Sequence, residues 1–263
     1  RLVRCAIMLS PKTIKDLHGI LHKALSQAVA IGYLRFNPTD ACNIPKVVRK
    51  ELTPLDTEDI QKFLTEIRGN PFEILLSVTL FMGLREGEVL ALSWHNIDFE
   101  HGTVLINCQL QRFREDKGVY RIVPTKNSKG RTIKPATAVM DLLKRQKAIQ
   151  AEMRLKAGTA WENNDFVFIN ECGHHFDNST IYRAFKKAAT AIGRPDARFH
   201  DLRHSYAVAA IQSGDDIKTV QSNLGHATAA FTLDVYGHVT EQIKQASSER
   251  MDNFIKSVSG GKK

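Results

Sequence analysis

Residues 94–134 decide the fold class, and they read WHNIDFEHGTVLINCQLQRFREDKGVYRIVPTKNSKGRTIK. β-Branched residues recur here in short runs, separated by turn signals at residues 100–102 and 127–130. This pattern predicts a small antiparallel sheet. We expect its strands at Trp94–Glu100, Thr103–Gln109, Val119–Val123 and Thr132–Lys134.

The sequence on both sides of this stretch has helical periodicity. Upstream, Ser10 can cap a helix, Pro11 suits its first position, and apolar residues recur at three- and four-residue steps until Gly32. Two further helices are predicted from Asp56 to about Glu66 and from Phe72 to Met82. Downstream, we expect helices at Ala136–Lys156, Asn178–Ile192, His200–Ser213, Asp215–Leu224 and Val239–Ser257, with a short strand at Phe166–Ile169. The predicted fold class is mainly α with a small antiparallel β-sheet, an α+β arrangement.

The chain of 263 residues is long enough for one to two domains. A polar, basic, proline-containing run from Asn37 to Pro54 predicts a linker, although any solvated connection could have this composition. The chain begins with Arg, no secretory leader is evident, and one helix cannot bury its own apolar face. We therefore interpret residues 1–48 as part of a helical domain plus the start of the linker, residues 49–258 as the main domain, and residues 259–263 as a flexible tail.

Charge gives the first indication of function. Lys and Arg number 37 against 28 Asp and Glu, a formal net charge of +9. Between Arg112 and Lys134 there are eight basic residues and two acidic ones. This concentration favours a polyanion such as nucleic acid, but lysines on a solvated hairpin that protects a sheet edge would look the same.

Cysteine spacing and hydropathy exclude several classes. The four cysteines contain no Cys-x-x-Cys pair, so a disulfide framework and a ribbon-type zinc site are not expected. No apolar stretch approaches the roughly 20 residues that span a bilayer. We expect a cytosolic protein that has no membrane partner.

His200-Asp201-Leu202-Arg203 is the first candidate for a chemical site. On a helix, His200 and Arg203 share a face, so they can point at one substrate. His200 and His204 also have the i, i+4 spacing of two zinc ligands, but a zinc-protease helix needs Glu where this chain has Asp201. The sequence therefore favours a site that binds no metal.

Other motifs accompany this one in a fixed order along the chain. They are Gly83-Leu84-Arg85-Glu86-Gly87-Glu88, a predicted hairpin at Pro124–Arg131, Leu224-Gly225-His226, and residues 232–239 around Tyr236. With His200–Arg203, this ordered set resembles the tyrosine recombinases, also called phage-type integrases, and most of all the integrases of conjugative transposons. The resemblance covers roughly Leu52 to Met251.

The resemblance implies a role for each matching residue. Glu88 could orient the first catalytic arginine, or it could form an ordinary salt bridge on a helix face. Lys129 is a rival for the role of the hairpin lysine. The implied catalytic set is Arg85, Lys126, His200, Arg203, His226 and the nucleophile Tyr236.

These residue types suit transfer of a DNA strand to an enzyme. Two guanidiniums can stabilise the charge that builds on the phosphodiester oxygens, and Lys126 can protonate the leaving 5′ oxygen as Tyr236 attacks. Because the 3′-phosphotyrosyl bond stores the bond energy, the resemblance implies no cofactor, neither metal nor ATP. It also implies that residues 1–48 are the C-terminal part of a helical core-binding (DNA-binding) domain plus the start of the linker, and that residues 49–258 are the catalytic domain with its C-terminal helix. The protein would act on the nucleoid in the bacterial cytosol, as a dimer to tetramer on DNA formed by exchange of the C-terminal helix.

We therefore predict a site-specific recombinase that integrates and excises a mobile element, with double-stranded DNA at the element ends and target as partner. A non-catalytic DNA-binding regulator would share the charge, and a type IB topoisomerase would share the chemistry. The residues expected to contact the DNA backbone are Lys46, Arg49, Lys50, Arg112, Arg114, Arg121, Lys129 and Arg131.

Overall fold

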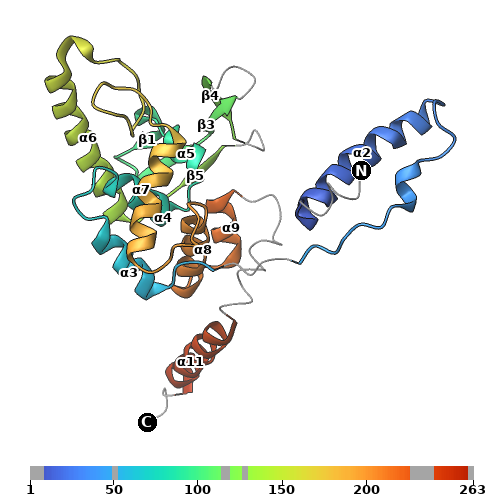
Figure 1. Cartoon of the computed structure of the whole chain (residues 1–263). Coiled ribbons are helices and arrows are strands. Elements are labelled where there is room, and N and C mark those ends of the chain that lie inside the picture. The colour runs from blue at the N-terminus through green and yellow to red at the C-terminus, as the bar shows by residue number, and fades with distance from the viewer. Residues whose placement is uncertain (1–8, 49–52, 114–118, 126–129, 226–239, 260–263) are drawn as a thin grey trace. The chain divides into compact units, whose positions relative to one another are not determined.

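A computed structural model describes residues 9–48, 53–113, 119–125, 130–225 and 240–259 (Figure 1). The chain divides into two compact units, Arg1–Glu51 and Leu52–Lys263. Lys126, Lys129, His226 and Tyr236, and with them Arg49, Lys50 and Arg114, lie outside the described residues.

The first unit contains one long helix, α2 (Pro11–Ala30), and a 3-10 turn, η1 (Pro38–Ala41). As predicted, Pro11 occupies the first turn of α2, and the Ser10 hydroxyl accepts a hydrogen bond from the backbone N–H of Thr13 at 3.1 Å. No residue of α2 is buried. The helix therefore leaves its apolar side exposed, including Leu17, Ile20 and Leu21.

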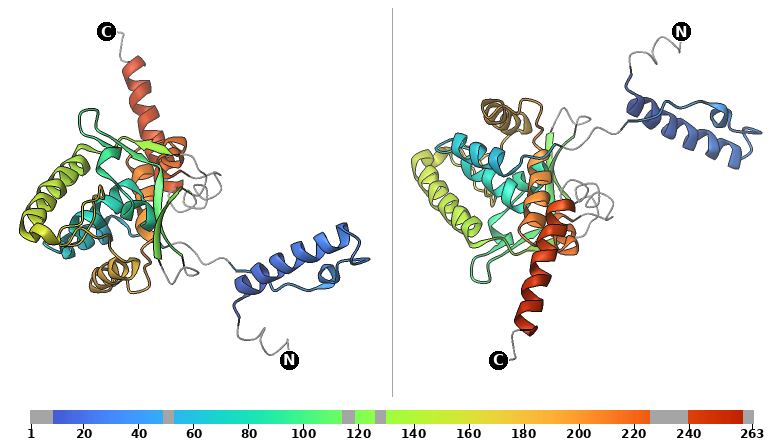
Figure 2. Two further views of the ribbon diagram at one scale, coloured as in Figure 1. Left: turned by 90° about the horizontal axis from the view of Figure 1, so that it is seen from above. Right: turned by 90° about the horizontal axis from the view of Figure 1, so that it is seen from below.

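The second unit is built around the helix α4 (Glu73–Met82), which is buried along almost its whole length. A helix that is apolar on all sides is stable only inside a core. The helices α6 and α8 pack against it, and α6 lies along the outer side of the unit (Figures 1 and 2). The other helices here are α3 (Thr57–Glu66), α5 (Glu86–Leu90), α6 (Thr137–Ala157), α7 (Asn178–Ala191), α8 (Asp201–Gln212), α9 (Ile217–Leu224) and α11 (Thr240–Ser259).

Within the described residues, the strands form two antiparallel sheets where the sequence predicted one. The first has the order β1-β2-β5, and the second pairs β3 with β4. The Asn107 carbonyl, between β2 and β3, accepts from the N–H of Thr125, so the two sheets follow each other along one nearly continuous strand. The bounds are β1 (Ile97–Asp98), β2 (Thr103–Ile106), β3 (Cys108–Phe113), β4 (Val119–Pro124) and β5 (Arg131–Ile133).

Three predicted details of the β-structure are wrong. Trp94–Asn96 forms a 3-10 turn, and only Ile97–Asp98 continues as a strand. The expected strand Phe166–Ile169 is reduced to two isolated bridges, from Phe166 to Ser93 and from Ile169 to His175. The flanks of the predicted hairpin do not pair with each other, because β4 pairs with β3 and β5 pairs with β2.

In the part of the chain that the structure describes, no helix is both long and apolar enough to cross a bilayer.

Three aromatic rings meet in the core. The ring centroids of Phe63 and Phe185 are 5.9 Å apart, and those of Phe185 and Phe199 are 5.6 Å apart. The contact between Phe63 and Phe185 joins α3 to α7.

Candidate active site

The end of α4 positions the first candidate arginine. Gly83 terminates this helix in the left-handed region, at φ 62°. A Cβ at this position would lie 2.5 Å from the Tyr206 ring, so both the backbone and the space require glycine. The chain then turns through buried Leu84 and begins α5 at Arg85, whose side chain retains 29% exposure.

Glu88 is the anion around which the site is organised. Its carboxylate is 1% exposed and accepts from the backbone N–H of Arg85 at 2.9 Å and from Arg85 Nη1 at 2.6 Å. Arg131 binds the same carboxylate in a bidentate way, with Nη1 at 3.0 Å and Nη2 at 2.7 Å. Burial alone would raise the pKa of Glu88, but the hydrogen bonds and charge of Arg131, with a further contribution from Arg85, lower that pKa to about 2.

Arg203 lies fully buried on α8 beneath this carboxylate. Its Nη1 donates to the carbonyl of Gly83 at 2.7 Å, and its Nη2 donates to the carbonyl of Leu224. These carbonyls stand at the C-terminal ends of α4 and α9, where the helix dipoles favour a cation. Nη1 also lies 3.9 Å from Glu88 Oε2, which completes a cluster of three arginines on one carboxylate.

One donor of Arg203 is still available. Its buried Nε has no hydrogen-bond partner within the described ranges. Burial, followed by the nearby Arg85 cation, lowers the pKa of Arg203 to about 9, so this side chain stays charged at neutral pH. An anion that enters the site can accept a hydrogen bond from this buried N–H group.

His200 stands at the start of α8, one turn before Arg203. Surrounding protein atoms, and then the charges of Arg203 and Arg85, lower the pKa of His200, so its imidazole is neutral near pH 7. Its ring lies edge-to-face against buried His204, with centroids 4.8 Å apart. Burial also lowers the pKa of His204, to about 4. A neutral imidazole beside two guanidiniums can accept a proton.

The structure thus brings together Arg85, His200 and Arg203, which the sequence placed in one site, and it adds the buried Glu88. Glu88 was expected either to orient Arg85 or to form a salt bridge on a helix face. Its burial and its four hydrogen bonds favour the orienting role. Within the described residues, no group of three or more His, Cys, Asp or Glu could hold a metal ion, so His200 and His204 belong to no such group.

The described basic residues that we expected on DNA fall into two groups. Lys46 is exposed, as are Arg112 and Arg121 on the β3-β4 ribbon, where they lie over the rings of Tyr120 and Phe113. Arg131 differs, because its side chain is only 10% exposed and its donors bind groups of the protein. Its contacts argue for a role inside the site.

Sequence reasoning missed this position of Arg131, although the sequence holds a signal for it. Side chains two residues apart in a strand share a face. Arg131 therefore shares its face with Ile133, which is buried. An arginine on the inward face of a strand needs an internal anion, and Glu88 is that anion.

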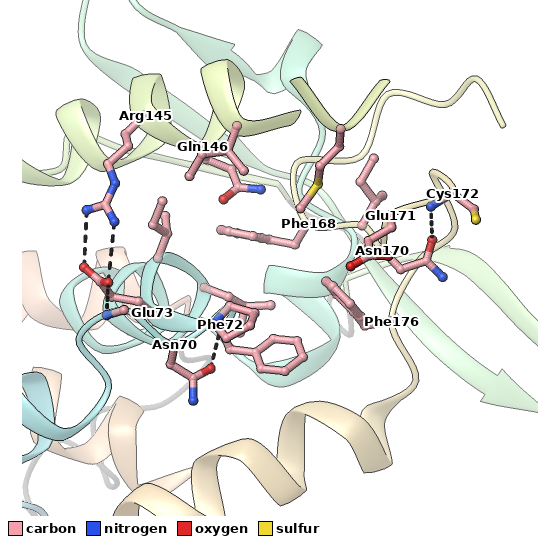
Figure 3. Close-up of a pocket in the computed structure, with 17 residues that line it drawn as sticks. Asn70, Phe72, Glu73, Arg145, Gln146, Phe168, Asn170, Glu171, Cys172 and Phe176 are labelled. Carbon is pink, nitrogen blue, oxygen red and sulfur yellow. Dashed lines mark hydrogen bonds and ion pairs between the residues drawn. The ribbon is translucent and has the colours of Figure 1, made fainter. Parts of the chain in front are cut away.

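A cavity of about 610 Å³ lies at the other end of α4, away from these residues (Figure 3). Its walls are largely apolar, with Phe72, Phe168 and Phe176 around it and Glu73 bonded to Arg145 at one side. None of the predicted site residues lines it. The cavity is therefore separate from the arginine cluster beyond the C-terminal end of α4.

The sequence of the chain is similar to those of known integrases and recombinases. The phage integrase family matches residues 51–242. A "tyrosine recombinase XerC-like" protein of Caldanaerobacter subterraneus subsp. tengcongensis is 31% identical, over 94% of this chain and 67% of its own length. The ICEBs1 integrase of Bacillus subtilis is 26% identical, with the same two coverages. The chain thus spans about two thirds of the length of these relatives.

Solved structures of similar shape include two that contain DNA. The integrase of transposon Tn1549, in complex with a circular intermediate DNA, gives a TM-score of 0.77 at 22% identity, over 95% of this chain and 82% of that chain. A lambda integrase dimer bound to a core site gives a TM-score of 0.59 at 19% identity, over 84% and 71% of the two chains. At these identities the likeness shows the fold.

Proposed function

Since the chain belongs to the phage integrase family of site-specific DNA recombinases, we propose that Arg85 and Arg203 of its arginine cluster hold a DNA phosphodiester for attack by Tyr236. The observation that carries this proposal is the set of contacts around Glu88. One buried carboxylate accompanies three guanidiniums, so the cluster has an excess of two positive charges. A phosphodiester has one negative charge and approaches two as a phenolate adds, and the cluster matches that change.

The reaction keeps its atoms and charges in balance. The phenolic oxygen of Tyr236 forms a bond to phosphorus, and the bond from phosphorus to the 5′ oxygen of the next nucleotide breaks. Arg85, which reaches solvent, and Arg203, through the Nε that has no partner among the described residues, donate hydrogen bonds to the non-bridging oxygens. The products are a 3′-phosphotyrosyl enzyme and a 5′ hydroxyl, and a second 5′ hydroxyl reverses the step to join strands.

Proton transfer needs one base and one acid. His200 is neutral near pH 7 because its surroundings lower its pKa, so it is suited to take the proton of the Tyr236 phenol. His226 would donate a further hydrogen bond to the phosphate. Lys126, which belongs to the segment between β4 and β5, would protonate the 5′ oxygen, with Lys129 as the alternative donor.

DNA binding and assembly complete the proposal. Exposed Lys46, Arg112 and Arg121 would contact the backbone of double-stranded DNA at the element ends and the target. We further propose that the protein acts in the bacterial cytosol on nucleoid DNA.

Strand exchange needs a dimer to tetramer, and α11 would join the protomers. Its exposed apolar residues support this: Met251, Phe254, Ile255 and Val258.

The test is to mix the protein with a nicked DNA that carries a recombination site, in EDTA, and to denature the mixture. The wild-type chain should leave a covalent protein–DNA adduct, whereas Tyr236→Phe should bind DNA and form none. An adduct that persists in Tyr236→Phe would place the nucleophile elsewhere. A chain that binds DNA and never forms an adduct would be a regulator, and one that relaxes any supercoiled DNA would be a topoisomerase.

A further inference from the structure

Arg131 joins three parts of the second unit through one side chain. It is the first residue of β5, and it directly follows the segment that contains Lys126. Its two terminal nitrogens bind the two oxygens of Glu88 at 3.0 and 2.7 Å. Its Nε donates to the carbonyl of Asn223, near the end of α9, at 2.6 Å. The guanidinium fork therefore has donors engaged on both sides.

The end of α9 is shaped to receive this side chain. Gly225 terminates the helix in the left-handed region, at φ 65°. A Cβ at position 225 would lie 3.0 Å from Cδ and 3.1 Å from Nη1 of Arg131, which is tighter than ordinary packing. The next carbonyl, that of Leu224, is bound by Arg203. Two arginines thus hold two successive carbonyls at the point where the chain continues to His226.

We propose that Arg131 is a positioning residue for DNA cleavage: it fixes Glu88 against Arg85 and ties both to the end of α9. This inference rests on the proposed function, because it assigns Arg131 to the same reaction. Without Arg131, the Glu88 carboxylate loses two of its four hydrogen bonds, and the carbonyl of Asn223 loses its donor. Displacing reacting groups by about 1 Å is enough to slow a reaction on the order of 100-fold.

The experiment separates DNA binding from cleavage in Arg131→Met and Arg131→Lys. Lys144→Met is the matched control, since it removes one exposed positive charge from α6. We expect Arg131→Met to cleave a nicked substrate at saturating protein about 10- to 100-fold more slowly. Its Kd for the same DNA should change less than about threefold, because the side chain binds protein groups. Arg131→Lys should fall between, since lysine keeps the charge without the planar fork.

A pH profile and an altered substrate test the route of the effect. Among the residues that the structure describes, the charged groups that face Glu88 are Arg85, Arg131 and Arg203. Loss of Arg131 should raise the pKa of this buried carboxyl, so cleavage by Arg131→Met should fall more steeply than wild type from pH 7 to pH 5. A 5′-bridging phosphorothiolate, whose sulfur leaves without an acid, should restore Lys126→Ala but leave Arg131→Met slow.

Several results would overturn the inference. One is a loss of DNA affinity in Arg131→Met with an unchanged cleavage rate, which would make Arg131 a DNA contact. Others are wild-type cleavage by the variant, a wild-type pH profile, or full restoration by the phosphorothiolate. If Arg131→Met does not fold, Arg131→Lys is judged by the same measurements. An adduct in the wild type keeps the proposed function standing whichever result is obtained.

Discussion

The two ends of α4 each carry a glutamate–arginine pair, and the pairs differ in burial. At the N-terminal end, Glu73 binds Arg145 at 3.2 Å, and the arginine is 54% exposed. Beyond the C-terminal end, Glu88 is 1% exposed and is shared by Arg85, Arg131 and Arg203. The first pair stands beside an apolar cavity, and the second brings three guanidiniums to one carboxylate.

The difference shows what burial does to the same chemistry. Water screens an exposed pair, which typically contributes about 0–1 kcal/mol to stability. A buried carboxylate must instead satisfy its lone pairs inside the protein, and removing one partner of such a pair costs about 3–5 kcal/mol. The hydrogen bonds and ion pairs that orient Arg85 are therefore screened little by water, and they offset the cost of burying the Glu88 charge.

The largest effect is expected from Arg203→Met. It leaves the carbonyls of Gly83 and Leu224 without their donor and removes a buried cation near Glu88. Urea unfolding should show a loss of about 3–5 kcal/mol, and the phosphotyrosyl adduct should not form. If Arg203→Met has the same free energy of unfolding as the wild type, substitution at the buried end of α4 destabilises the protein no more than substitution at the exposed end.

The next largest effect should be a difference between Glu88 and Glu73 in how each contributes to stability at low pH. The pKa of Glu88 is lowered from 4.5 to about 2, so its contribution to stability is present above pH 4.5 and is lost as the pH falls toward 2. The full contribution is about 3 kcal/mol. Urea midpoints measured from pH 6 to pH 2 should fall less in Glu88→Gln than in the wild type. Glu73→Gln serves as the control, and an equal change in both variants would contradict the comparison.

Glycine substitutions on either side of α4 should give a smaller difference. Gly83→Ala combines a positive φ with contact to the Tyr206 ring, whereas Gly69→Ala has a positive φ and open space. We expect a cost of about 2–4 kcal/mol at position 83 and about 1–2 kcal/mol at position 69. Thermal unfolding of the two variants measures the difference, and equal melting temperatures would show that the contact with Tyr206 is relieved easily.

The smallest effect belongs to the exposed pair. Arg145→Met should change the free energy of unfolding by less than about 1 kcal/mol, with DNA cleavage unchanged, because Arg145 lies at the end of α4 away from the arginine cluster. The same urea series and adduct assay check this. A loss comparable to that of Arg203→Met would show that the two ends are coupled.

Local signals explain which parts of the fold could be predicted. Ser10 and Asp56 cap helices through their own side chains, and Gly83 ends α4 through its own backbone freedom, so neighbouring residues suffice to predict them. The family and the mainly α fold with antiparallel strands are confirmed. The division into two sheets was missed because it depends on pairing of β5 with β2, across more than twenty residues.

In the site, too, the position of residues on one helix could be predicted from the sequence, whereas contacts between distant segments could not. Spacing along α8 indicated that His200 and Arg203 share a face, and the structure places both beside Arg85. The contact of Arg131 with Glu88 joins residues 43 positions apart, and its contact with Asn223 spans 92. No periodicity encodes such pairs, and only the inward register of β5 indicates that Arg131 faces the interior. The roles of Lys126, His226 and Tyr236 stay predictions.

The pairing of β4 and β5 with successive parts of one long strand has an evolutionary consequence. Each strand is held in register by its own partner, and Thr125 is tied back to Asn107. The residues between them can therefore gain or lose length without shifting either sheet. Changes of length between β4 and β5 should therefore accumulate faster in evolution than changes within either strand.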